Sequence, residues 1–176
     1  CDPGGADERI VMRYRDAPSV EVSELIRGVS AEDAWAVVTD IELPTHTDGE
    51  LVSVDWVGSP AEVVVGARFR GTNSADGLGT WTAECVITEV EPPRRWTWTA
   101  GGPTGEPWAT WAFEIDRASE GVIVRQWARL GPGPSRLSQV IESKPDLEGR
   151  IIARRMSDWR RGMQANLDWV RVRLES

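Results

Sequence analysis

Residues 147–174 are LEGRIIARRMSDWRRGMQANLDWVRVRL, a stretch in which large apolar side chains recur at intervals of three and four residues. This spacing brings side chains onto one face of an α-helix. The pattern therefore predicts a long amphipathic helix at the C-terminal end of the sequence, with one apolar stripe over about six turns. The stripe consists of Ile152, Met156, Trp159, Met163, Leu167, Val170 and Leu174.

The sequence before this helix is a series of short apolar segments separated by turn residues. The segments are rich in β-branched and aromatic residues, which favour strands, and they end at glycine, proline or asparagine. Short connections between consecutive strands favour an antiparallel meander. The expected strands cover residues 19–26, 51–57, 67–71, 81–90, 95–100, 108–115 and 122–129.

A helical segment is expected between the first two strands. Ser30 is a suitable N-cap residue, and Asp33 follows it at the position of a carboxylate capping box. This helix should end near Pro44. The element order predicts an α+β fold in which a curved antiparallel sheet of about seven strands wraps around the C-terminal helix, with residues 19–176 as one domain and residues 1–18 as an N-terminal tail or edge segment.

Composition excludes several classes of protein. The chain has 176 residues, 40% hydrophobic and 27% charged, which is typical of one globular domain, and no apolar run has the roughly 20 residues that a membrane span needs. A net charge of −8 disfavours nucleic-acid binding. The cytoplasm is the expected compartment, because no secretory leader is recognisable. The sequence begins at Cys1 and not at methionine, so what precedes Cys1 stays open.

Residue counts also limit the chemistry. One histidine, one lysine and two cysteines do not supply a structural zinc site, and the single lysine lies in an expected loop, where a Schiff base is disfavoured. No complete nucleotide-binding fingerprint occurs. We therefore expect no metal or organic cofactor; the alternative that the residue counts leave open is a metal site built mainly from carboxylates.

Ten tryptophans, set against two phenylalanines and one tyrosine, are the most unusual feature of the composition. Tryptophans on strands either pack in the core or line a cavity, and both uses suit a large apolar ring with one N–H donor. Because a curved sheet leaves a gap at its concave face even when it buries a helix, a cavity is expected there. Six tryptophans lie on expected strands: Trp81, Trp96, Trp98, Trp108, Trp111 and Trp127.

Several local motifs resemble the START-like superfamily, also called SRPBCC, and within it the polyketide cyclase/dehydrase-type proteins of actinobacteria. The resemblance covers about residues 19–174 and depends on the order of the motifs. They are GARFRG at 66–71, GTWT at 79–82, EVEPPRRWTW at 89–98, LGPGPS at 130–135, RRM at 154–156 and GMQANL at 162–167.

The resemblance implies a helix-grip fold, in which the last helix closes a hydrophobic cavity. Members bind lipids, sterols, polyketides or hormone-like molecules, and some cyclise and dehydrate a poly-β-keto chain; the fold alone does not choose between these functions. The first hypothesis is that the protein binds a small hydrophobic or aromatic molecule. The alternative is a polyketide cyclase/aromatase, and a third class is an interaction module that uses the C-terminal helix.

The candidate catalytic residues are Arg70 and His46. In the family's cyclases an arginine holds an enolate or carboxylate, and Arg70 takes this role if it faces the cavity; if Phe69 faces inward, Arg70 is solvated. His46 is the only side chain that titrates near neutrality, and it follows the first helix, where the family has its cavity entrance. A solvated loop histidine is the alternative.

Candidate ligand-binding residues follow from strand alternation and from the helical stripe. Cys85 is expected to be a buried, inert thiol, and the alternative is a nucleophile with His46 as its base. Gln126 is a polar group that enters the cavity if its side of the strand faces in. The full candidate set is Trp81, Cys85, Trp98, Trp111, Phe113, Gln126, Trp127, Met156, Trp159 and Met163.

The C-terminal helix is basic, although the chain as a whole is acidic. From Glu148 onward it has seven arginines and four acidic residues. A solvated face opposite the apolar stripe explains this composition. The other hypothesis is a docking site for an acidic partner such as an acyl carrier protein, with Arg150, Arg154 and Arg161 as the contacts.

Overall fold

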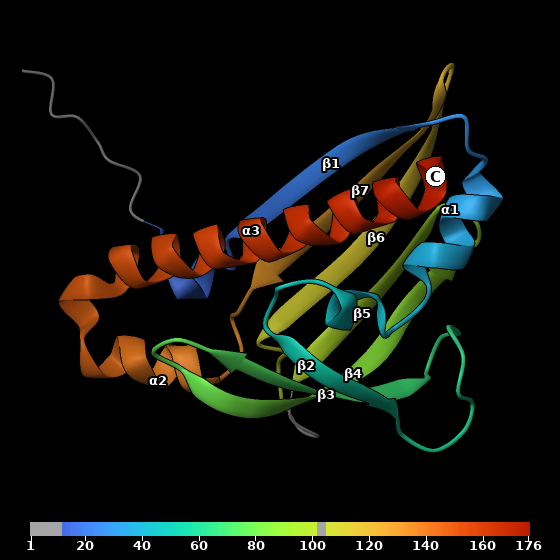
Figure 1. The fold of residues 1–176 in the computed structure, drawn as a ribbon. Helices are drawn as coiled ribbons and strands as arrows, with labels where there is room; N and C mark the ends of the chain where they lie inside the picture. The colour runs from blue at the N-terminus through green and yellow to red at the C-terminus, as the bar shows by residue number, and fades with distance from the viewer. Residues whose placement is uncertain (1–11, 102–104) are drawn as a thin grey trace, which may run out of the picture.

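The computed structural model describes residues 12–101 and 105–176. Its 7-stranded antiparallel sheet has the order β1-β7-β6-β5-β4-β3-β2, so every strand except β1 pairs with its neighbour in the sequence (Figure 1). The expected meander is confirmed. The strands are β1 (Ser19–Arg27), β2 (Leu51–Trp56), β3 (Arg68–Ala75), β4 (Gly79–Glu91), β5 (Arg95–Gly101), β6 (Ala109–Ala118) and β7 (Gly121–Leu130).

The long helix α3 (Glu148–Glu175) lies along the concave side of the curled sheet and packs chiefly against β1 (Figure 1). Its predicted stripe faces the sheet, and Ile152, Met163, Leu167 and Val170 are at most 1% exposed. Because the sheet curls around this helix, the fold is the helix grip expected from the sequence. The remaining helices are η1 (Tyr14–Asp16), α1 (Ala31–Val38), η2 (Leu43–His46), α2 (Arg136–Ser143) and η3 (Pro145–Leu147).

The start of α1 is as the sequence predicts, and its end is not. The Asp33 N–H donates to Ser30 Oγ at 3.1 Å, and the Ser30 N–H donates to Asp33 Oδ2 at 3.4 Å, which completes the capping box. The helix ends at Val38 and not near Pro44. Thr39 Oγ1 donates to the Trp35 carbonyl at 2.7 Å, and Pro44 lies in the separate 3-10 helix η2.

The end of β3 and the presence of the helix α2 also differ from the sequence expectation. β3 continues to Ala75, because Asn73 and Ser74 pair with Trp81 and Thr80 of β4 and do not form the predicted turn. The helix α2 was not predicted; it is capped by Ser135 and Ser138 and buries Leu137 and Ile141. This helix leads through η3 into the start of α3 (Figure 1).

Residues 12–18 pack against the domain through Tyr14, which is 7% exposed. Its hydroxyl donates to the Gly133 carbonyl at 2.5 Å, and its N–H donates to Glu148 Oε1 at 2.9 Å. Burial raises the pKa of the Tyr14 phenol. Residues 1–11 of the predicted tail lie outside the described residues.

Candidate functional site

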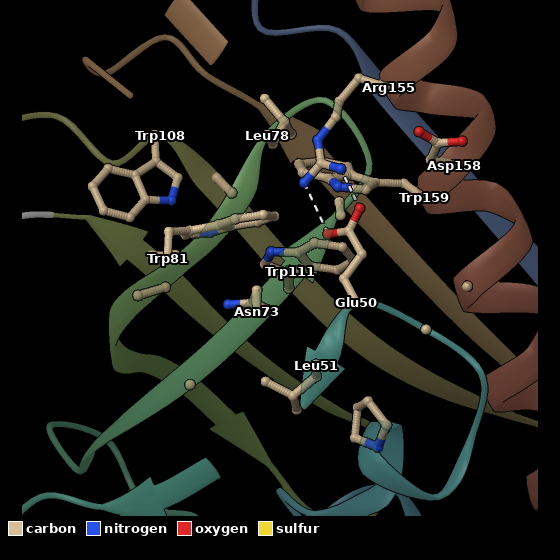
Figure 2. Close-up of a pocket in the computed structure, with 18 of the residues that line it drawn as sticks. Glu50, Leu51, Asn73, Leu78, Trp81, Trp108, Trp111, Arg155, Asp158 and Trp159 are labelled. Atoms are coloured by element: carbon tan, nitrogen blue, oxygen red, sulfur yellow. Dashed lines mark hydrogen bonds and ion pairs between the residues drawn. The ribbon is translucent and has the colours of Figure 1, made fainter. Parts of the chain in front are cut away.

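A cavity of about 1060 Å³ lies between the concave face of the sheet and α3. Pockets that take small organic ligands have volumes of about 300–1000 Å³ and are mostly apolar, with a few placed polar groups. Figure 2 shows Trp81, Trp108, Trp111 and Trp159 around this space. The aromatic residues that line it are Phe69, Trp81, Trp96, Trp98, Trp108, Trp111, Phe113 and Trp159.

Small residues on the concave face of the sheet leave room for this cavity. Gly71 of β3 pairs with Ala83 of β4, and Ala100 of β5 pairs with Ala109 of β6. All four residues line the cavity. α3 packs chiefly against β1, at the other side of the sheet, and the Leu51 side chain lies over Gly71.

The aromatic wall is held by contacts between its own rings. The Trp111 ring centroid lies 4.5 Å from that of Trp159 on α3 and 6.4 Å from that of Trp98 on β5. Trp96 stacks on Trp98 at 4.3 Å, and its indole N–H donates to the Val38 carbonyl at 3.0 Å. The wall therefore presents its aromatic faces in fixed orientations.

One chain of side-chain hydrogen bonds orients an amide at the inner end of the cavity. Thr47 Oγ1 donates to Asn166 Oδ1 at 2.9 Å, and Asn166 Nδ2 donates to Gln126 Oε1 at 3.1 Å. Gln126 is only 2% exposed. Because its oxygen accepts from Asn166, its nitrogen is the atom left to donate, and no described residue accepts from it. This donor suits a carbonyl or phenol oxygen of a ligand.

A charged pair lines the cavity at a place that we call its mouth, because the Glu50 side chain is 24% exposed to solvent there; Figure 2 shows the pair. Arg155 of α3 binds Glu50, which precedes β2, through both guanidinium Nη atoms, and the Nη2–Oε2 distance is 2.8 Å. Arg155 Cζ lies 5.5 Å from the Trp81 ring centroid and 5.4 Å from that of Trp159. The pair therefore connects α3 to the chain before β2, beside two of the cavity's indole rings.

Most of the predicted ligand-binding residues share this cavity. Gln126 faces inward, so the side of β7 that the sequence left open is the inner side. The lining residues among those predicted are Trp81, Cys85, Trp98, Trp111, Phe113, Gln126, Trp159 and Met163.

Trp127 and Met156 are predicted ligand residues that do not line the cavity. Alternation on β7 places Trp127 on the outer face, because Gln126 faces inward. There its indole N–H donates to Glu114 Oε1 at 2.8 Å, and its ring lies under Arg95 and Arg129. Met156 is 8% exposed and belongs to the hydrophobic core.

The two candidate catalytic residues, Arg70 and His46, are not brought together and do not line the cavity. Phe69 faces inward, so Arg70 lies on the outer face and pairs with Glu84, where the Arg70 hydrogen bond lowers the pKa of the Glu84 carboxyl. His46 is exposed and stacks on Trp169, with the ring centroids 5.1 Å apart. The solvated alternative describes both residues.

Cys85 lines the cavity as a buried thiol. Burial raises its pKa to about 12, so almost no thiolate forms near neutrality. We expect the peptide containing Cys85 to stay unlabelled by iodoacetamide at pH 8 and to become labelled in denaturant, as measured by peptide mass mapping. Rapid labelling of the native protein at this cysteine would contradict the buried, inert thiol.

Comparison with known families identifies the chain. The model of the family described as polyketide cyclase / dehydrase and lipid transport matches residues 17–170. The chain belongs to this family. No curated protein was found to match it in sequence.

Solved structures confirm the helix-grip fold of this family member. It is similar to the Polyketide_cyc-like protein Cgl2372 from Corynebacterium glutamicum, with 20% identity, a TM-score of 0.60, and coverage of 89% of this chain and 91% of that one. It is also similar to the di-domain ARO/CYC protein StfQ of the steffimycin biosynthetic pathway, with 16% identity and a TM-score of 0.64. The match covers 92% of this chain and 52% of that one. At these identities the likeness shows the fold alone.

The polar lining of the cavity of this polyketide cyclase/dehydrase family member includes residues that the sequence did not indicate as site residues, among them Glu50, Arg155 and Asn166. For two of them, the spacing from residues of the apolar stripe of α3 indicates that they lie on the buried side of the helix. Arg155 precedes Trp159 by four residues and Asn166 follows Met163 by three, so both share the buried side of α3. Glu50 lies in a turn-rich segment, and nothing local distinguishes it from its acidic neighbours.

Within residues 12–101 and 105–176, no helix is long and apolar enough to cross a membrane. The same residues hold no group of three or more histidine, cysteine, aspartate or glutamate side chains that could bind a metal ion.

Proposed function

We propose that this protein binds a small hydrophobic or aromatic molecule, polyketide-like or lipid-like, in the cavity between the sheet and α3. The observation that carries the proposal is an aromatic cavity with an oriented amide donor. A ring that enters it can stack on several fixed indole faces, and each good aromatic contact is worth about 0.5–1.5 kcal/mol beyond burial of its area. The Gln126 amide nitrogen then fixes the orientation of the ligand through one polar atom.

Native mass spectrometry and tryptophan fluorescence test this proposal. We expect purified protein to take up an aromatic polyketide or a fatty acid as a bound mass, and we expect the same compound to quench the tryptophan emission, because six of the ten tryptophans line the cavity. Trp127→Phe is the control, since Trp127 lies on the outer face and should not affect binding. A clean unliganded mass, with no quenching by any compound of the panel, would reject the proposal.

A second candidate function is cyclisation and dehydration of a poly-β-keto chain. The Glu50–Arg155 pair favours it, because this pair supplies a charged donor to polarise a carbonyl and a carboxylate to accept a proton beside the same cavity. Exposed arginines of α3, Arg150, Arg154 and Arg161, would then receive an acyl carrier protein. The test is incubation of the protein with a poly-β-keto mimic. If the candidate is right, an aromatic product forms, and the Glu50→Gln variant does not form it. Binding of the mimic without any product would leave only the binding function.

A further inference from the structure

Arg155 is the one buried charged side chain among the described residues that form the core, with 7% of its surface exposed. A guanidinium is always ionised, and a buried charge is tolerated only when an opposite charge or several hydrogen bonds compensate for it. Glu50 provides this compensation through both carboxylate oxygens. The protein therefore maintains a carboxylate-binding group beside the aromatic wall of the cavity.

The two partners of this pair differ in their surroundings. The side chain of Arg155 is 8% exposed, whereas that of Glu50 is 24% exposed. The backbone of Glu50 is fixed, because its carbonyl accepts from the Ser74 N–H at 2.9 Å. Its neighbours Asp48 and Gly49 are exposed, so the Glu50 carboxylate can turn toward solvent without movement of the sheet. The Arg155 guanidinium cannot turn toward solvent in the same way, because Trp81 and Trp159 flank it.

A second donor beside Arg155 lacks an acceptor. Trp159 is 6% exposed, and its indole nitrogen is buried with no hydrogen-bond partner among the described residues. Its ring centroid lies 5.4 Å from Arg155 Cζ, and Figure 2 shows both side chains beside the Glu50 carboxylate. An unpaired buried donor is uncommon in proteins. The Trp159 indole nitrogen is therefore a second donor in this part of the cavity that an oxygen atom of a ligand could satisfy.

The other charges at the mouth do not oppose an anion at Arg155. Asp158, the nearest carboxylate along α3, is held by Arg154 at 3.4 Å and by Arg161. Arg136 of α2 adds a further positive charge to the lining. The remaining acidic residues of the lining are exposed, and solvent and salt screen them: Asp40, Asp48 and Asp76.

We propose that the ligand of this cavity carries a carboxylate, which replaces Glu50 on Arg155 while the apolar body of the ligand lies among the tryptophans. The inference rests on the proposed binding function and names the ligand class of that same site. In the unliganded protein Glu50 occupies the place of the ligand carboxylate. Binding then exchanges one charged bidentate pair for another, so the guanidinium is never left buried without a partner.

Isothermal titration of acids and their neutral amides tests this proposal on the unaltered protein. The probes are 2-naphthoate with 2-naphthamide, and dodecanoate with dodecanamide, so each pair differs only at the head group. At neutral pH we expect each carboxylate to bind at least about tenfold more tightly than its amide. Equal affinities within both pairs would overturn the carboxylate inference and leave the binding function intact. Failure of all four probes to bind would count against the proposed function itself.

Two variants separate recognition from a structural role of the pair. Arg155→Gln should remove the preference for the acid and leave amide affinity nearly unchanged. Glu50→Gln should act in the opposite direction and strengthen acid binding by about threefold to tenfold, because the internal competitor is gone. A merely structural pair would weaken acid and amide alike in both variants, and that result would overturn the inference. Arg173→Gln, exposed on the same helix and outside the lining, is the control.

Discussion

Trp96→Ala is expected to lower the free energy of unfolding by about 3–5 kcal/mol, the usual range for removal of a fully buried phenylalanine or tryptophan. Trp96 is 2% exposed, and it joins β5 to the end of α1 through its hydrogen bond to the Val38 carbonyl at 3.0 Å. It also supports Trp98 by stacking at 4.3 Å. Urea denaturation followed by circular dichroism measures the change.

Two matched variants show which property of Trp96 matters. Trp96→Phe keeps a ring but loses the hydrogen bond, and should cost about 1–2 kcal/mol in addition to the change in packing. Trp127→Ala removes the same side chain from the outer face, where it is only half-buried, and should cost clearly less than Trp96→Ala. If Trp96→Ala cost no more than Trp127→Ala, the assignment of Trp96 to the core and of Trp127 to the outer face would be wrong.

Ala83→Phe should abolish ligand binding by filling the cavity. Ala83 lines the cavity opposite Gly71 of β3, so a phenyl ring at this position points into the space between the sheet and α3, beside the Leu51 side chain. We expect affinity for the best ligand to fall by at least about 100-fold, which corresponds to about 2.7 kcal/mol. Stability should change by less than about 1.5 kcal/mol, because the ring enters existing space. Titration calorimetry and urea denaturation measure the two effects.

Val86→Phe is the control for this variant. Val86 is on the same strand, and at 39% exposure it lies on the outer face. The same enlargement there should leave binding unchanged. Equal loss of affinity in Ala83→Phe and Val86→Phe would mean that the ligand does not occupy the cavity.

The architecture could be predicted from the sequence because it is encoded locally. The spacing of the α3 stripe, the Ser30–Asp33 capping box and the turn residues between strands each act within a few residues, and the structure bears out all three. Predictions were less successful where a segment obtains its structure from a partner. Asn73 and Ser74 have the composition of a turn, yet pairing with β4 extends β3 through them.

The site was harder to predict because each inner residue on a strand has an outer neighbour of similar chemistry. Phe69 and Arg70 alternate on β3, and Gln126 and Trp127 alternate on β7; the residue that enters the cavity depends on which face the whole sheet turns inward. Arg70 and Trp127 were named as candidate site residues while the direction of their strands was left open, and both lie on the outer face. The periodicity of the sequence alone does not determine which face of the sheet turns inward.

The charged pair at the cavity mouth is a feature of tertiary structure. Glu50 and Arg155 are 105 residues apart in the sequence, and they meet only because α3 passes over the chain that leads into β2. The family resemblance implied an arginine on a strand as the anion-binding group, whereas the buried arginine of this cavity, Arg155, is on the helix α3.

Indole ¹H–¹⁵N correlation spectra of the protein, recorded during titration with its tightest-binding ligand, test the central claim most directly. The indole resonances can be assigned through single Trp→Phe variants. We predict that the N–H signals of Trp81, Trp111 and Trp159 shift on binding, while those of Trp127 and Trp169, which do not line the cavity, stay in place. Shifts confined to Trp127 and Trp169, or no shift at a ligand concentration that saturates calorimetric binding, would contradict a ligand site between the sheet and α3.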